Sequence, residues 1–107
     1  MRAEALKGHL DVLLLAIVGD TPAHGYAVIE ELRRRSRGAF DLPEGTVYPA
    51  LHRLERAGLL SSRWEADAPR RRRVYALTPK GRRALGRGRT DWQAFTTAVD
   101  VVLGGAA

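Results

Sequence analysis

Basic side chains that could hold an anion are concentrated in one stretch of the sequence. Between Asp67 and Asp91 the chain has no acidic residue, while the net charge of the whole chain is +6. The basic residues of this stretch are Arg70, Arg71, Arg72, Arg73, Lys80, Arg82, Arg83, Arg87 and Arg89. Such a block attracts polyanions, nucleic acid first and an anionic membrane surface second. A solvated face, with arginine chosen through genome base composition, is the alternative.

A second polar set lies on one side of a predicted helix that begins near residue 46. At about 100° per residue, Val47, Leu51 and Leu54 share one narrow sector, which Ala50 joins. The opposite side carries Gly45, Pro49, His52, Arg53 and Arg56, with Thr46 and Tyr48 on its flanks. With Thr46 as N-cap, Pro49 occupies the third helical position, where its missing N–H costs little. The amides of Val47 and Tyr48 would then remain free to meet an anion.

Two further helices must position this segment. Leu6, Leu10, Leu13, Leu14, Ile17 and Val18 follow the spacing of one helix face, and residues 19–22 supply a stop. A second helix opens at His24-Gly25 and closes in residues 36–38. Because few residues join the two helices, we expect them to pack against each other.

The period changes after Gly58. Leu60 and Trp64 alternate with polar residues, and a second alternating run covers residues 73–77, which predicts a two-stranded hairpin whose turn includes Pro69. Thr78 and Pro79 then provide a cap and a first helical residue. The helix that follows carries an apolar stripe at heptad-like steps, made of Leu85, Trp92, Phe95, Val99 and Val102 with Gly88 in the open slot. The three-helix core of the same chain could cover part of this stripe, but a partner chain is the more economical cover.

Composition excludes several classes of protein. The chain of 107 residues, 45% of them hydrophobic, is long enough for one core. It has no cysteine, and its three histidines lack metal-ligand spacing, so we expect neither a metal site nor a cofactor. No nucleophile has an evident base, and we expect no enzyme. The longest apolar run is far too short for a membrane span, which predicts a soluble cytoplasmic protein.

The order helix, helix, helix, basic hairpin predicts a winged helix-turn-helix, a mainly α fold of the α+β type. The third helix would enter the major groove of DNA, and the hairpin, or wing, would reach the backbone. We expect residues 1–78 to form this DNA-binding domain with a two-stranded wing, and residues 79–107 to form a long C-terminal dimerisation helix.

Four segments resemble PadR-type transcriptional regulators. They are LKGHLDVLLLAIV, HGYAVIEEL, LPEGTVYPALHRLERAGLL and RRRVYALTPKGRRAL, and they cover roughly residues 6 to 85 in order. The single C-terminal helix is similar to that of the family's short subclass. The resemblance implies a homodimeric repressor that binds an inverted-repeat operator. It also points to Tyr48 as a phosphate or groove contact and, as in some relatives, to a flat aromatic ligand held between paired C-terminal helices.

The candidate functional residues form two sets. For DNA binding they are Thr46, Tyr48, Pro49, His52, Arg53, Arg56, Arg70, Arg71, Arg72 and Arg73. For dimerisation they are Leu6, Leu10, Leu85, Trp92, Phe95, Val99 and Val102, of which Trp92 and Phe95 are also candidates for stacking on an aromatic effector.

Several of these residues also fit ordinary structural roles. Tyr48 would also fit a half-buried core position, Arg56 a pair with Glu55 or solvent, and each wing arginine a solvated hairpin tip. A basic RNA- or ribosome-associated protein is the nearest alternative function, since its affinity would follow charge and RNA shape. A protein-interaction module is a third.

Overall fold

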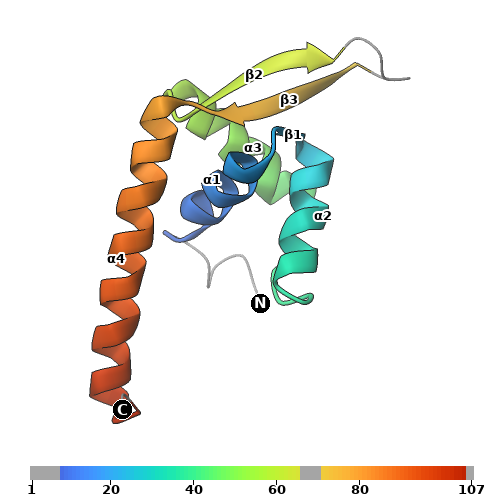
Figure 1. The fold of residues 1–107 in the computed structure, drawn as a ribbon. Helices are drawn as coiled ribbons and strands as arrows, with labels where there is room; N and C mark the ends of the chain where they lie inside the picture. Colours follow the sequence, from blue (N-terminus) through green and yellow to red (C-terminus); the bar gives the residue numbers. More distant parts are fainter. Residues whose placement is uncertain (1–7, 66–70, 106–107) are drawn as a thin grey trace.

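The computed structural model describes residues 8–65 and 71–105 of the chain. Three helices, α1 (Leu10–Asp20), α2 (Gly25–Arg35) and α3 (Glu44–Arg56), form a bundle on one side of a small antiparallel sheet (Figure 1). A fourth helix, α4 (Pro79–Leu103), extends as a long rod away from this body. The predicted mainly helical winged fold is confirmed. The predicted Leu6 contact lies outside the described residues.

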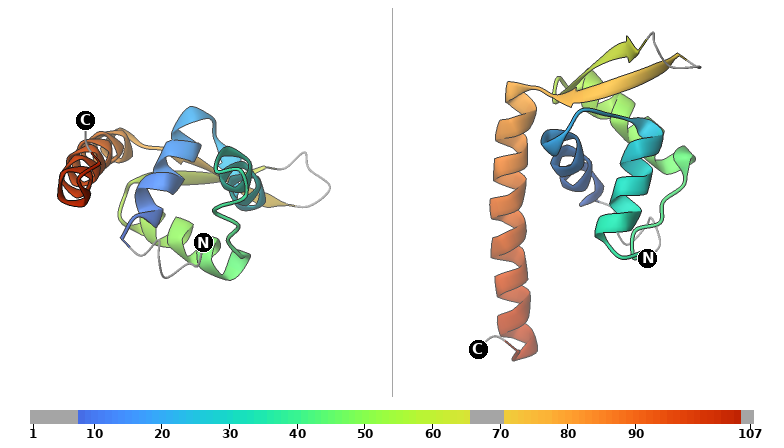
Figure 2. Two further views of the ribbon diagram at one scale, coloured as in Figure 1. Left: turned by 90° about the horizontal axis from the view of Figure 1, so that it is seen from below. Right: turned by 45° about the vertical axis from the view of Figure 1, so that its right-hand side comes forward.

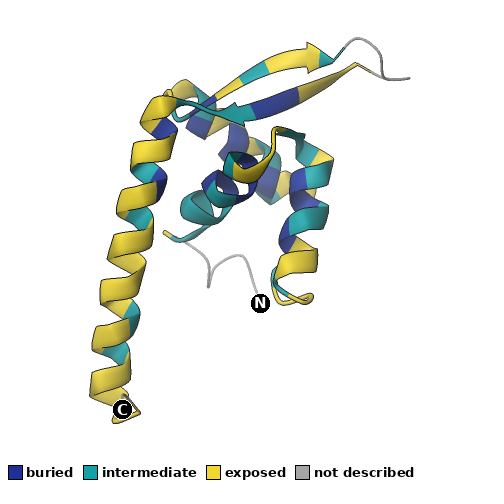
Figure 3. Cartoon of the chain, in the orientation of Figure 1, coloured by how far each residue is buried: buried dark blue, intermediate teal, exposed yellow. Residues whose placement is uncertain are grey.

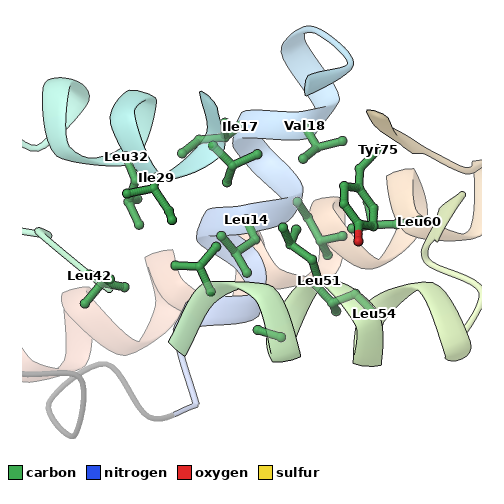
Figure 4. Packing of buried hydrophobic residues seen from close by; sticks show 14 of the residues in the cluster. Leu14, Ile17, Val18, Ile29, Leu32, Leu42, Leu51, Leu54, Leu60 and Tyr75 are labelled. Carbon is green, nitrogen blue, oxygen red and sulfur yellow. The ribbon is translucent and has the colours of Figure 1, made fainter. Parts of the chain in front are cut away.

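The core fills the space between the three helices and the sheet. Figure 4 shows side chains from all these elements pointing toward one another. The buried apolar residues include Leu14 and Val18 of α1, Val28, Ile29 and Leu32 of α2, Val47, Leu51 and Leu54 of α3, and Leu60 and Tyr75 of the sheet. The helical periodicity in the sequence therefore identified the inward faces of α1 and α3. Helix α1 runs through Gly19 and Asp20, slightly beyond the predicted stop, and Thr21 ends it in an extended conformation.

The sheet has a strand that the sequence did not reveal. Strands β2 (Leu60–Glu65) and β3 (Arg72–Leu77) form the predicted hairpin, and β1 (Ala23–His24) pairs antiparallel with the other side of β3. Two residues are too few to show an alternating pattern, so sequence periodicity could not detect β1. Because β3 is central near β1, both Val74 and Tyr75 are buried, and the simple alternation expected for β3 fails there.

Helix α3 begins three residues earlier than predicted. Pro43 is its N-cap, and its carbonyl accepts the amides of Thr46 and Val47 at 3.0 and 3.2 Å. Thr46 is therefore not the cap, Val47 has no free amide, and Pro49 is the sixth helical residue rather than the third. The proline removes the donor that the carbonyl of Gly45 would receive. Since Gly45 is exposed, water can satisfy that carbonyl, and the helix continues to Arg56.

Helix α4 starts as the sequence predicts. The Thr78 hydroxyl accepts the amide of Gly81 at 2.9 Å, and Pro79 occupies the first helical position. The first turns of α4 lie against α1, as both views in Figure 2 show, and a side chain on Gly88 would collide with Val12. Gly81 and Leu85 are buried there, whereas most of the rest of α4 is exposed (Figure 3). At 1.5 Å per residue its 25 residues span about 37 Å, which dominates the longest extent of the molecule, 53 Å.

Candidate nucleic-acid interface

The outward face of α3 carries most of the side chains that the sequence singled out. Pro49, His52, Arg53 and Arg56 are exposed, while Thr46 and Tyr48 are half-buried on its flanks. The opposite face of the helix is sealed into the core by Val47, Ala50, Leu51 and Leu54. Burial of one face fixes the rotation of α3 about its axis. The polar residues are therefore held outward together, as the sequence predicted.

Tyr48 joins α3 to the start of α2. Its ring lies so close to the backbone of Gly25 that a Cβ atom on Gly25 would stand 2.3 Å from Tyr48 Cε1. Burial raises the pKa of the Tyr48 hydroxyl, and the Glu44 carboxylate adds to that rise. The ring thus packs as a half-buried side chain. Glycine at position 25 is explained by this close approach.

Arg53 is held by an acidic residue of α1. Its Nη1 and Nη2 atoms donate to the two carboxylate oxygens of Asp11 at 2.9 and 2.7 Å. This hydrogen-bonded carboxylate raises the pKa of Arg53 above its ordinary value. The pair spans 42 residues of sequence, so no local pattern could have predicted it.

On the other flank of α3, a polar chain connects the helix to the wing. Ser62 donates to the Glu55 carboxylate at 2.6 Å, and Arg73 Nε donates to the Ser62 hydroxyl at 2.7 Å. Glu55 is therefore engaged with the wing and not with Arg56. Within the described ranges, Arg56 has no ion-pair or hydrogen-bonding partner and remains free to meet an external anion.

The wing displays an aromatic platform for its arginines. The guanidinium carbons of Arg71 and Arg73 lie 4.6 and 4.9 Å from the ring centroid of Trp64, within cation–π range. Trp64 is 49% exposed, because the hairpin projects beyond the core although Trp64 shares the strand face of buried Leu60. Arg70 lies outside the described residues.

Arg72 points to a different partner. Its Nε and Nη2 atoms donate to Glu65 Oε1 across the hairpin at 3.1 and 3.0 Å. Side-chain pairing across the two strands accounts for this, since Glu65 and Arg72 face each other in register.

A shallow hollow lies where α2, α3 and the wing meet. Its volume is about 460 Å³, and its lining consists of His24, Gly25, Tyr26, Tyr48, His52, Trp64, Arg71, Arg72, Arg73 and Tyr75.

His24 caps α2, because its Nδ1 atom accepts the amide of Ala27 at 3.4 Å. Burial lowers the pKa of His24, the Arg72 guanidinium lowers it further, and Glu65 opposes them. Neutral His24 keeps Nδ1 available as an acceptor.

The apolar stripe of α4 divides into two parts. Leu85 is buried in the core of its own chain and needs no second chain to cover it. Farther along, Trp92 and Phe95 are 46% and 54% exposed, and their ring centroids lie 5.8 Å apart. His9, at the start of α1, meets Trp92 edge-on at 5.1 Å. Val102, near the end of the helix, is 84% exposed.

The remaining predicted contacts are less exposed. Leu10 is half-buried against the core, and Val99 is half-buried within the stripe.

In the described part of the chain, no group of three or more His, Asp or Glu residues could hold a metal ion. Likewise, none of the helices described above is long and apolar enough to cross a membrane.

Comparison with known proteins places this geometry in a family. The model of the transcriptional regulator PadR-like family matches residues 14–87. Transcriptional regulator Rv3488 of Mycobacterium tuberculosis is 41% identical over 92 residues, which cover 86% of this chain and 80% of that protein.

Solved structures share the fold. A PadR family transcriptional regulator from Eggerthella lenta is 31% identical, with a TM-score of 0.83 over 94% of this chain and 86% of that one. A transcriptional regulator from Clostridium thermocellum has a TM-score of 0.85 over 92% of this chain and 96% of that one. At 22% identity, the latter shows the fold alone.

Proposed function

The chain belongs to the PadR-like family of transcriptional regulators, and we propose that it acts as a homodimeric repressor that binds an inverted-repeat operator in double-stranded DNA. The family consists of regulators and not of enzymes. The observation that carries the proposal is the outward face of α3 beside a basic wing, with α3 fixed in rotation by its buried side. A rigid helix with a polar outer face is the form that reads a major groove.

Each predicted contact has a distinct role in this proposal. His52, Arg53 and Arg56 lie in the groove beside Pro49, and Thr46 and Tyr48 lie at its edge. Arginine can pair bidentately with guanine, whereas hydroxyl groups more often meet phosphates. In the wing, the arginines from Arg70 to Arg73 contact the DNA backbone. Residues 1–78 form the DNA-binding unit, and residues 79–107 form the dimerisation helix.

The second chain would cover the exposed part of the α4 stripe, around Trp92, Phe95 and Val102. Large apolar side chains exposed at successive turns of one helix are typical of an interface. A two-fold dimer presents two reading helices in opposite directions, which matches an inverted repeat.

The cluster of His9, Trp92 and Phe95 supports a further part of the proposal, release from DNA by a small aromatic effector. Half-exposed rings offer a flat surface on which such a ligand can stack. A titration with aromatic compounds should change both tryptophan fluorescence and operator affinity. If neither changes with any compound, Trp92 and Phe95 serve dimer packing only.

The wing is tested by the salt dependence of DNA binding. Replacing Arg71 and Arg72 with alanine should flatten the slope of log affinity against log salt by about 0.9 for each phosphate that the wing no longer neutralises. Replacing Arg87 and Arg89 of α4 with alanine removes the same two positive charges away from the wing and is the matched control. An unaltered slope in the double variant would remove the wing from the proposed interface.

Competition separates operator binding from general affinity for nucleic acid. The protein should retain DNA from upstream of its own gene in the presence of excess RNA or random-sequence duplex. Equal competition by RNA would favour an RNA-associated role, because that affinity follows charge and RNA shape. Absence of any salt-dependent DNA binding would favour a protein-interaction module.

A further inference from the structure

Arg53 lies on the reading helix, yet its guanidinium already has an anionic partner. Both of its terminal nitrogens donate to Asp11, one to each carboxylate oxygen. A phosphate or a guanine edge would seek the same planar donors in the same bidentate way. Arg56, three residues along the helix, has no such partner in the described part of the chain. The two arginines therefore present different energetics to DNA.

The position of Asp11 is fixed by the packing around it. It lies in the first turn of α1, where the neighbouring Val12 packs against Gly88 of α4 and His9 contacts Trp92. The carboxylate is thus presented to Arg53 by a helix anchored at both ends of its first turn. It cannot be treated as a mobile counter-ion on a loop.

The strength of the pair suits an exchange of partners. The Arg53 and Asp11 side chains are 57% and 44% exposed, so water screens their attraction. Exposed ion pairs typically shift an equilibrium by a factor of about one to five. DNA phosphates can overcome an attraction of this size. The free energy needed to separate Arg53 from Asp11 is nevertheless subtracted from the free energy of DNA binding.

We propose that Asp11 competes with DNA for Arg53, so that this carboxylate sets the affinity of the reading helix from outside the helix itself. The proposal rests on the proposed DNA-binding function. Arg53 is bound to Asp11 in the free protein and transfers to a phosphate or guanine in the complex, leaving Asp11 without its partner. The competing carboxylate lowers affinity for any duplex that Arg53 contacts.

The test is a double-mutant cycle with a duplex that the protein has enriched from a random-sequence pool. Asp11→Asn should bind this duplex roughly two- to fivefold more tightly than the wild type. In an Arg53→Gln background the same substitution should give no gain in DNA affinity, because Asp11 then has no guanidinium to pair with. Asp20→Asn is the matched control, since Asp20 lies at the other end of α1 and pairs with Arg35. It should give a smaller gain.

Each outcome decides the matter. A gain that persists without Arg53, or that Asp20→Asn equals, would overturn the proposal, because charge alone would then explain it. A loss of affinity in Asp11→Asn would also overturn it and make Asp11 a residue that positions Arg53 for DNA. If the wild type enriches no duplex, both the proposed function and the proposal about Asp11 fail.

Thermal unfolding checks that the variants are folded. If Asp11→Asn does not fold, Asp11→Ser replaces it.

Discussion

Arginines that look equivalent in the sequence have different surroundings in the fold. Arg53 and Arg72 are engaged by carboxylates, and Arg71 lies over Trp64. Arg73 also lies over Trp64 but pairs with Glu55 at 4.0 Å as well, and Arg56 has no partner among the described residues. A guanidinium that must first leave a carboxylate contributes less to DNA affinity than one held ready by an aromatic ring. At the residue scale, the partner of each arginine in the free protein therefore predicts how much that arginine contributes to DNA affinity.

Trp64 should matter for DNA binding although it need not touch DNA. Trp64→Ala removes the surface that holds Arg71 and Arg73, and exposed cation–π contacts are worth about 0.5–1 kcal/mol each. We expect a DNA affinity several-fold weaker, with little change in the free energy of unfolding because the residue is half exposed. Trp64→Phe keeps a ring and should retain most of the affinity. Equal binding of the alanine and phenylalanine variants would contradict this role.

Sequence reasoning located the basic and aromatic residues but not their partners. Asp11 and Arg53 meet because α1 crosses α3, and a contact across 42 residues leaves no periodic signal. Strand alternation places Trp64 on the same side of the sheet as Leu60, but it does not reveal where the sheet leaves the core. Prediction at this scale is limited by tertiary contacts.

Elements were predicted more completely than single contacts. Apolar periodicity located the inward faces of α1 and α3, and Thr78-Pro79 marked the start of α4. The start of α3 was misplaced because two prolines, Pro43 and Pro49, each fit a helix beginning, and only the hydrogen bonds to the Pro43 carbonyl decide between them. Strand β1 was missed because it is short.

The cap of α2 should make stability depend on pH through His24. Its pKa is lowered in the folded state, so the unfolded chain binds more protons, and stability present above about pH 6.5 is lost as the pH falls below it. His24→Ala should lose about 1 kcal/mol of unfolding free energy at neutral pH, whereas His24→Asn can still cap. Urea unfolding at two pH values on either side of 6.5 checks this. The asparagine variant should lose less stability at low pH than the wild type, and an equal loss would argue against His24.

Two glycines of α4 should respond oppositely to alanine. At Gly81 a Cβ atom would lie 2.0 Å from the carbonyl oxygen of Leu59, so the backbone must move, and we expect a loss of at least about 2 kcal/mol. Gly86 has open space around it, and alanine there should stabilise the helix by about 0.5–1 kcal/mol. Chemical unfolding of both variants measures the difference. A stable Gly81→Ala protein would contradict the packing of α4 on the β2 side of the body.

At the scale of the whole molecule, the fold separates two surfaces. The reading face belongs to α3 and the wing, whereas the exposed part of the apolar stripe lies on the free part of α4, which is largely exposed in Figure 3. His9 and Val12 in the first turn of α1 contact α4, and Asp11 in the same turn contacts α3. This turn is the structural link between the proposed dimer surface and the proposed DNA surface.

Dimerisation should depend on which side of α4 is changed. Val102 continues the stripe of Trp92, Phe95 and Val99, while Val101 lies about 100° around the helix from it. Both valines are exposed, at 84% and 64%. Val102→Asp should shift the protein from dimer to monomer in sedimentation experiments, and Val101→Asp should leave the dimer intact. Two variants that behave alike would show that the stripe is not the interface.

The most direct test is to let the protein select its own site from a random-sequence DNA pool. A two-fold dimer with one α3 helix in each major groove should enrich an inverted repeat whose half-sites are centred about one helical turn, roughly 10 base pairs, or a multiple of it apart. The complex should contain two protein chains for each duplex. Selection of no common sequence, or of a single unrepeated site bound by one chain, would contradict the proposed mode of binding.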